Sequence, residues 1–336
     1  MEAQKPVVEL AMQAIRLCLA GETLAGVEAY RQALACSGGH KVPVGLHLMQ
    51  LASGGHAKAA ELVRQAALET DADVSVSWAF GRQTDPRNAI AEYEALFTSG
   101  TANARMVSNY MTRLSLAGES AGLAAVAAPE KLFRNTALRV NGPLSPFLRR
   151  VSTALRNSVE RRFFETEYAA RNMDRVHRTH RSKDPAILEL HAAIRVHVAA
   201  YLREIAATGH VMAKWLPSEF ELRSWAVISD GTGHLVPHIH SGCWVIGVVY
   251  IEGTNPALSN DGNAGVLRIG APPEGVSTCP GWPQLTVPPV PGTIVLMPAF
   301  YTHWVEPIPA SSSRISVAFN VIDAPGSRDT RSRMVP

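Results

Sequence analysis

The sequence lacks several features that mark common classes of protein. Its four cysteines show no CxxC spacing, which excludes a zinc ribbon and does not fit a disulfide scaffold. No run approaches roughly 18 apolar residues, and no cationic-then-apolar segment opens the chain. No P-loop, dinucleotide-binding glycine motif or Ser-His-Asp order at a strand-to-helix elbow is present. We therefore expect a soluble cytoplasmic protein without a membrane partner.

The sequence also lacks a large excess of positive or negative charge. The chain carries 32 Lys and Arg against 29 Asp and Glu, a formal net charge of +3. Such a balance creates no field that would attract nucleic acid, so we expect no nucleic-acid partner. The hydrophobic content of 46% is that of a globular chain, and 336 residues are more than one compact core usually organises. Two domains are predicted.

The first part of the chain has a helical pattern. Residues 5–132 are rich in Ala, Leu, Glu and Arg, with apolar residues at helical spacing. Breaks that contain glycine divide this stretch at Gly21, Gly54, Gly55, Gly100 and Gly118. Gly21 and Gly55 are 34 residues apart, and a period of about 34 is that of the tetratricopeptide repeat. We predict a tetratricopeptide-like helical domain over residues 1–135, with a plain helical bundle as the alternative.

A second helical region precedes a change of pattern. Residues 145–215 are largely helical in pattern, and we assign residues 136–218 as helical support for the β-rich part of the chain. This region includes a basic, histidine-rich run, Arg175–Arg181. Such a run is typical of a solvated loop; the alternative is a lid, or a contact for an acidic substrate, beside an active site.

From Leu222 the chain consists of short Val- and Ile-rich segments separated by Gly and Pro. Predicted strands cover residues 225–229, 243–251, 265–269, 293–297 and 315–321. Several short strands with little helix are typical of a jelly roll or sandwich. The predicted fold class is α+β: the β-barrel core spans residues 219–323 within a domain of residues 136–325, and a basic tail covers residues 326–336.

Three histidines in the β-rich part form a candidate metal site. His238 and His240 stand two apart in an extended segment, so both imidazoles face the same side. His303 follows a second predicted strand and supplies a third nitrogen if the barrel closes, and Arg314 opens the last strand. Two close ligands, one distant histidine and a buried cation match the plan of a facial-triad iron site, which leaves positions on the metal open.

Other residues near these strands have assigned roles. Ser316 faces the same way as Arg314 and can donate a further hydrogen bond to an anion held there. Tyr250 and Trp244 are expected in the core of a buried strand, with lining of a co-substrate pocket as the alternative. His234 is assigned to a loop, and Asn320 is expected to bond backbone.

The segment Trp225–Ile251, which contains Pro237-His-Ile-His, resembles the core motif of bacterial 2OG-Fe(II) oxygenases that often occur behind tetratricopeptide repeats. The downstream order of Gly265-Val-Leu-Arg-Ile-Gly, Pro291-Gly-Thr-Ile-Val-Leu-Met-Pro, His303 and Arg314-Ile-Ser-Val-Ala-Phe-Asn is similar too. The resemblance covers residues 220–323. It implies a double-stranded β-helix in which His238, His240 and His303 surround Fe(II) and Arg314 holds 2-oxoglutarate, with O₂ as the second co-substrate.

One residue departs from the wider superfamily, which has a carboxylate where this chain has His240. Either His240 ligates and the site has three histidines, or water fills the position and His240 lies behind it. We expect a dioxygenase that hydroxylates a C–H bond of a peptide or protein docked by the helical domain.

Three alternatives stay open: a small-molecule hydroxylase of the same class, a cupin-type three-histidine enzyme and a non-catalytic interaction protein. A cupin fits less well, because Trp244 and Val245 stand where its glutamate would come after the His-x-His pair.

Overall fold

The computed structural model describes residues 5–36, 47, 51, 55–69, 86–98, 100, 102–254, 262–271, 278–309 and 312–324. The predicted basic tail at 326–336 lies outside these residues. The chain divides into two compact units, Met1–Ala117 and Gly118–Asp329. The sequence prediction placed the domain boundary at residue 135, so two short helices and the start of the first strand lie between the two positions.

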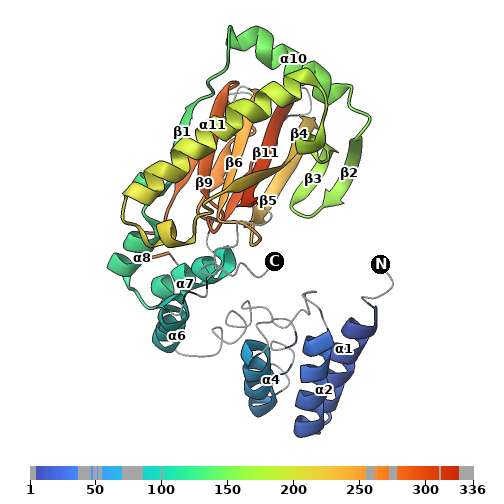
Figure 1. The fold of residues 1–336 in the computed structure, drawn as a ribbon, viewed down its shortest axis with the longest axis vertical. Helices are drawn as coiled ribbons and strands as arrows, with labels where there is room; N and C mark the ends of the chain where they lie inside the picture. The colour runs from blue at the N-terminus through green and yellow to red at the C-terminus, as the bar shows by residue number, and fades with distance from the viewer. Residues whose placement is uncertain are drawn as a thin grey trace. The chain divides into compact units, whose positions relative to one another are not determined.

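The described part of the first unit is helical (Figure 1). Its helices are α1 (Lys5–Leu19), α2 (Thr23–Cys36), α4 (Ala57–Glu69), α6 (Pro86–Thr98) and α7 (Ala104–Leu116). Gly21, Gly100 and Gly118 come after three of these helices with positive φ, a conformation that costs glycine little and ends a helix. The predicted helices and breaks are confirmed for the described residues, and the tetratricopeptide-like character stays a prediction.

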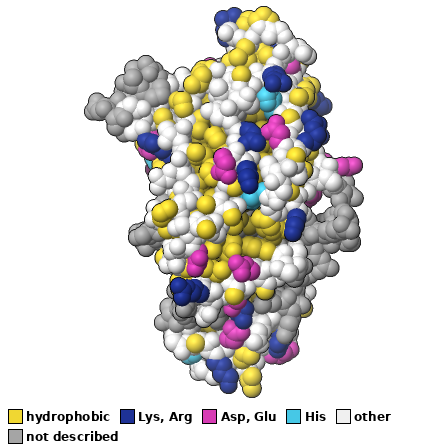
Figure 2. Space-filling model, turned by 90° about the vertical axis from the view of Figure 1, so that its left-hand side faces the viewer, with side chains coloured by type: hydrophobic (Ala, Val, Ile, Leu, Met, Phe, Trp, Pro, Cys, Tyr) yellow, Lys and Arg dark blue, Asp and Glu magenta, His cyan; other side chains and the backbone are white. Residues whose placement is uncertain are grey.

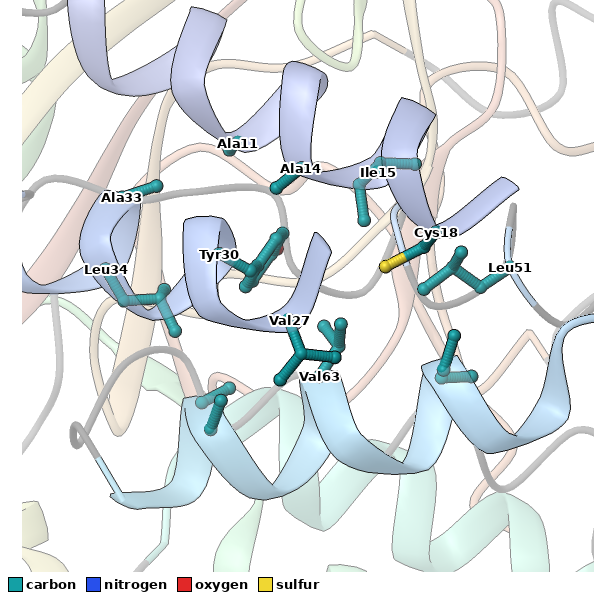
Figure 3. Packing of buried hydrophobic residues seen from close by; sticks show 14 residues of the cluster. Ala11, Ala14, Ile15, Cys18, Val27, Tyr30, Ala33, Leu34, Leu51 and Val63 are labelled. Atoms are coloured by element: carbon teal, nitrogen blue, oxygen red, sulfur yellow. The ribbon is translucent and has the colours of Figure 1, made fainter. Parts of the chain in front are cut away.

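Helices α1, α2 and α4 share one hydrophobic core, to which Leu51 also belongs (Figure 3). Its buried members are Ala11, Ala14, Ile15, Cys18, Val27, Tyr30, Ala33, Leu34, Leu51, Ala59, Ala60, Val63, Ala66 and Ala67. The many alanines let the helix backbones approach closely. A Cβ added to Gly26 would lie 2.4 Å from Cys18 Sγ and 2.8 Å from the carbonyl oxygen of Ala14. Helix α2 therefore packs on α1 through a position that has no room for a methyl group.

The second unit is built on an antiparallel sheet of eleven strands, in the order β1-β9-β6-β11-β4-β3-β5-β10-β7-β8, with β2 paired to β3. The strands are β1 (Arg134–Ala137), β2 (Arg161–Glu167), β3 (Ala170–Val176), β4 (Phe220–Asp230), β5 (His234–His238), β6 (Val245–Glu252), β7 (Leu267–Ile269), β8 (Leu285–Val287), β9 (Thr293–Pro298), β10 (His303–Val305) and β11 (Ser313–Asp323). The five predicted strands are confirmed as β4, β6, β7, β9 and β11. This nearly closed sheet is consistent with a double-stranded β-helix.

Helices cover the outer face of the sheet. The unit contains α8 (Ser120–Ala127), α9 (Pro129–Leu132), α10 (Leu144–Arg156), α11 (Pro185–Ala207) and the 3₁₀ helices η2 (Thr179–Arg181) and η3 (Val211–Trp215). Figure 1 shows α11 lying across the sheet beside α10. The Asp184 carboxylate caps α11 by accepting from the Ala186 N–H at 2.8 Å, and Pro185 occupies the first turn. None of the described helices combines the length and apolar character needed to cross a bilayer.

The region 145–215 is largely helical as predicted, but the β2–β3 hairpin interrupts it. Its turn lacks the Asn-Gly or Gly-Gly pair that reveals a hairpin in a sequence. Instead Tyr168 takes the left-handed conformation, with φ 50°. The basic run is correspondingly not a single solvated loop, since Arg175 and Val176 belong to β3 and Arg175 is buried. His234 is the first residue of β5 and is therefore not a loop residue. Trp244 lies in the core as expected, and its ring stacks on that of Trp215 with the centroids 4.9 Å apart.

Replacing Gly26 by Ala tests the close packing of α1 and α2. In a helix without neighbours, Gly→Ala stabilises by roughly 0.5–1 kcal/mol, because glycine loses more backbone entropy on folding. Here the added methyl group must push the helices apart, and overpacking typically costs about 1–3 kcal/mol. We expect Gly26→Ala to lower the free energy of unfolding of the helical unit, measured by denaturant titration of its helical circular dichroism. Ala25→Gly, on the exposed side of α2, is the control, because it measures the difference in helix propensity between Ala and Gly without a change in packing. A stabilised Gly26→Ala variant would contradict the packing.

Candidate active site

Two neighbouring strands bring the three predicted histidines together. Strand β5 ends at His238 and β10 begins at His303, and the antiparallel register places these two residues opposite each other. His240 comes two residues later, where its backbone N–H donates to the Ala299 carbonyl at 3.1 Å. The ring centroids are 4.3 Å apart for His238 and His303, 5.1 Å for His238 and His240, and 5.2 Å for His240 and His303. One ligand atom from each residue lies within 4.8 Å of the others, a spacing that could hold a metal ion.

Hydrogen bonds donated by Nδ1 fix the tautomer of each imidazole. The acceptor is the Val236 carbonyl for His238 at 2.9 Å, the Tyr301 carbonyl for His303 at 3.0 Å and Asn320 Oδ1 for His240 at 2.6 Å. Because each acceptor requires a proton on Nδ1, Nε2 is the nitrogen with a lone pair for a metal. Asn320 therefore bonds a histidine side chain, which corrects the expectation that it bonds backbone.

Burial keeps the three imidazoles neutral. Desolvation lowers the pKa of His240 to about 4, with a further contribution from His238. Burial likewise lowers the pKa of His238, and it holds that of His303 well below the ordinary value, where His238 and His240 add to the effect. A metal ligand must be deprotonated at Nε2, so no proton has to be displaced at neutral pH when a cation binds.

Arg314 is a buried cation without a described carboxylate partner. It lies on β11, is 1% exposed, and donates from Nη1 to the Gly265 carbonyl at 3.2 Å, while its Nε finds no acceptor among the described residues. Burial lowers its pKa, and the neighbouring Tyr250 phenol acts in the opposite direction. Leaving a guanidinium buried in this way costs several kcal/mol unless an anion neutralises it. The position therefore fits the carboxylate of a ligand.

Two further predicted residues lie beside Arg314. Ser316 is two residues further along the same face of β11 and stands opposite Tyr250 of β6 in the strand register. Burial raises the pKa of Tyr250 to about 12, so its phenol stays protonated and can donate. All three side chains line a cavity of about 420 Å³ that the three histidines also line. The structure therefore brings together all six predicted site residues.

Sequence reasoning missed the part of the cavity formed by the β2–β3 hairpin. Glu167, Tyr168 and Arg175 line this side, together with Trp225 of β4. For the basic run that contains Arg175, the sequence favoured a solvated loop, and a contact beside the active site was the alternative. Glu167 and Tyr168 carried no signal, because the hairpin itself was not recognised.

The residues present fit an iron ion and an anionic co-substrate. Three neutral imidazoles suit Fe(II) and leave coordination positions for other ligands. Gly265 has φ 68°, and a Cβ there would lie 2.9 Å from both Ile308 and Thr254 and 3.5 Å from Arg314 Cδ. A side chain at this position would collide with Ile308 and Thr254 but would only touch Arg314, whose Nε finds no acceptor among the described residues.

Comparison with known proteins agrees with this chemistry. Residues 223–320 match the family model described as "Putative 2OG-Fe(II) oxygenase". Oxygenases of this family use Fe(II), 2-oxoglutarate and O₂. No curated protein matches the chain in sequence.

Several solved structures are similar to part of the chain. A prolyl-4-hydroxylase from Pseudomonas putida is 15% identical over 60% of this chain and 99% of its own, with a TM-score of 0.38. A prolyl hydroxylase from Trichoplax adhaerens, solved with a peptide fragment of hypoxia inducible factor, is 13% identical over 64% and 94%, with a TM-score of 0.43. A non-heme alpha ketoglutarate dependent epimerase from nogalamycin biosynthesis is 14% identical over 61% and 84%, with a TM-score of 0.42.

The hydrogen bond from His240 to Asn320 gives a test of metal ligation by His240. Removing an outer partner of a ligating histidine typically weakens metal affinity 10–100-fold. We expect Asn320→Ala to lower the affinity for Fe(II) by about that factor in anaerobic titration, and Asn320→Asp, which keeps an acceptor, to retain it. Unchanged affinity in Asn320→Ala would show that His240 is not a ligand and that water fills its position.

Proposed function

We propose that this 2-oxoglutarate-dependent Fe(II) oxygenase hydroxylates a C–H bond of a peptide or protein side chain. The observation that carries the proposal is a buried arginine that has no carboxylate partner among the described residues and lies in the same cavity as three neutral histidines. Three imidazoles alone would suit several metals and reactions. Arg314 adds a fixed requirement for a carboxylate, which the distal end of 2-oxoglutarate meets.

Each site residue then has one task. His238, His240 and His303 would hold the metal through Nε2, and the hydrogen bonds that Nδ1 donates keep the rings in place. Arg314 binds the distal carboxylate of 2-oxoglutarate, with Tyr250 and Ser316 as neutral donors beside it. When iron, 2-oxoglutarate and O₂ are bound, they supply an oxidant that replaces C–H by C–OH, and 2-oxoglutarate becomes succinate and CO₂. The apolar wall formed by residues such as Val227, Leu235 and Val305 limits the access of water.

One feature supports a peptide or protein as the substrate, and another speaks against a nucleic acid. Stacked helices present extended binding surfaces, and α1, α2 and α4 of the first unit pack on a shared core. The face in Figure 2 shows Lys and Arg interspersed with Asp and Glu among hydrophobic side chains, without the basic field that a nucleic acid would require.

A small-molecule hydroxylase is the second candidate. A cavity of about 420 Å³ has the size of a site for a compact ligand.

The test is iron- and 2-oxoglutarate-dependent succinate formation, combined with mass spectrometry of candidate peptides and small molecules for one added oxygen atom. We also propose a cytoplasmic location, since Cys18 and Cys243 carry free thiols, which persist in a reducing compartment.

Replacing His303 by Ala should remove the metal. His303 is 6% exposed and stands between β5 and β7, so neither solvent nor a nearby side chain can easily take its place. We expect loss of succinate formation and loss of iron after gel filtration, with elemental analysis as the measurement. Ala in place of His234, which lies outside the cavity lining, is the matched control and should keep its iron. Normal iron content in His303→Ala would overturn the assigned metal site.

Replacing Arg314 tests the co-substrate site independently of the metal. A charge-assisted contact is worth about 1.5–3 kcal/mol, so Arg314→Gln should raise the apparent constant for 2-oxoglutarate by roughly 10- to 100-fold. Iron should still bind, and Arg314→Lys should recover only part of the loss, because an ammonium group lacks the planar fork. Melting temperature is measured in parallel. An unchanged 2-oxoglutarate saturation curve with a lowered melting temperature would show that the arginine is purely structural.

A further inference from the structure

A second guanidinium, that of Arg175, lines the cavity beside the histidines. Arg175 lies on β3 and is only 9% exposed. Its Nη1 donates to Glu167 Oε2 at 2.6 Å, whereas its Nε is buried and has no acceptor among the described residues. A buried N–H without an acceptor typically costs about 1–3 kcal/mol. A ligand oxygen that accepts from Arg175 Nε would remove this cost.

Aromatic rings hold this guanidinium in place. Its central carbon lies 5.4 Å from the ring centroid of Trp225 and 6.0 Å from that of Tyr168. Contacts of this kind stabilise a planar cation and restrict its rotation. Tyr168 forms the tip of the β2–β3 hairpin, is 87% exposed and has φ 50°. An exposed aromatic side chain in a strained backbone conformation therefore stands at the side of the cavity where Arg175 is found.

The strand register separates Arg175 from the co-substrate residues. Arg175 stands opposite Val227 of β4, and Val227 stands opposite Ser316 of β11. Two strand spacings therefore lie between Arg175 and Ser316, a backbone distance of roughly 10 Å. A 2-oxoglutarate held by Arg314 and Ser316 leaves Arg175 free for another molecule.

The pairing of Arg175 with Glu167 indicates which chemical group of that molecule can bind here. The pair is neutral overall and presents an N–H donor on Arg175 next to a carboxylate acceptor on Glu167. A ligand carboxylate would be attracted by one partner and repelled by the other at similar distances. An extended peptide residue suits both, because its own C=O accepts and its own N–H donates on the same side of the strand.

We propose that Arg175 and Glu167 bind the backbone C=O and N–H of one extended residue of a peptide substrate and place a side chain beside it near the three histidines. Arg175 donates to the C=O of that residue and Glu167 accepts from its N–H, while Trp225 and Tyr168 pack against the apolar part of the peptide. The inference rests on the proposed oxygenase function and names the chemical class of its substrate. Arg175 is thus a specificity-determining residue with no part in holding the metal or the co-substrate.

Equilibrium dialysis of the anaerobic Fe(II)- and 2-oxoglutarate-loaded protein tests the proposal with two matched mixtures. One contains N-acetyl amino acid N-methylamides, which carry amides on both sides, and the other contains the corresponding N-acetyl amino acids with a free carboxylate. Mass spectrometry reports which members are retained. We expect the wild type to retain members of the amide series at least about 10-fold more tightly than their free acids. Arg175→Met should weaken the retained amides by about 10-fold or more, a change that corresponds to one hydrogen bond to a charged group.

The variants distinguish recognition from a structural role. Arg162→Met, at the exposed position opposite Arg175 on β2, is the matched control and should bind like the wild type. Glu167→Gln should narrow the preference for amides over acids, because it removes the repelling charge. Retention of neither series by the wild type, a preference for free acids, or unchanged amide binding in Arg175→Met would each overturn the proposal.

Two readouts separate this proposal from the oxygenase assignment. Iron content and the 2-oxoglutarate saturation curve should be unchanged in Arg175→Met; a raised 2-oxoglutarate constant would place Arg175 in the co-substrate site and overturn the inference. The oxygenase assignment fails by a different result, namely that the wild type forms no succinate with Fe(II) and 2-oxoglutarate.

Discussion

The register between β5 and β10 holds the site together, because it places His238 opposite His303. Side chains alternate between the two faces of a strand, so a slip of one residue would turn an imidazole out of the cavity. Strand β10 is only three residues long, but it pairs on both sides, and His303 also stands opposite Ile269 of β7. Double pairing gives this short strand a fixed position that it could not keep at an edge.

Electrostatics divides the cavity into regions with different tasks. Arg314 and Arg175 are both buried guanidiniums, and they differ in whether a protein carboxylate neutralises them. Among the described residues, the Arg314 side chain has only the uncharged Gly265 carbonyl as a hydrogen-bond partner. Its positive charge is therefore not neutralised, and it can bind an anion. Arg175 is already paired with Glu167 and needs a neutral polar group. The histidines, kept neutral by burial, add no positive charge that would blur this distinction.

An ion-pair cluster on the outside of the sheet supports the start of β11. Arg156 of α10 donates to Glu252 at 2.6 Å, to Ser313 at 2.7 Å and to Asp230 at 3.2 Å, and so joins the ends of β6, β11 and β4. Each pair is partly exposed and contributes little to stability by itself. Their combined effect is positional, because Ser313 directly precedes Arg314. Helix α10 thus holds the point at which the arginine enters the sheet.

The sequence alone determined the residues with a strong local pattern. His238 and His240 share a strand face at a spacing of two, and the Val- and Ile-rich runs predicted five strands of the sheet. The glycine breaks likewise predicted where helices of the first unit end. The matching order of motifs added His303 and Arg314, which no local pattern could have linked to the pair.

Tertiary structure alone decided the rest, because the deciding contacts join residues that are distant in sequence. Asn320 supports His240 across 80 positions, and the pairing of β3 with β4 sets Arg175 among the residues of the cavity. The β2–β3 hairpin escaped prediction because Tyr168 makes its turn without glycine, in a backbone conformation that packing must stabilise. In the basic run, the fold buries Arg175 and leaves Arg178 and Arg181 exposed. The sequence shows which residues carry charge, but only the fold decides which of these charges are buried and paired.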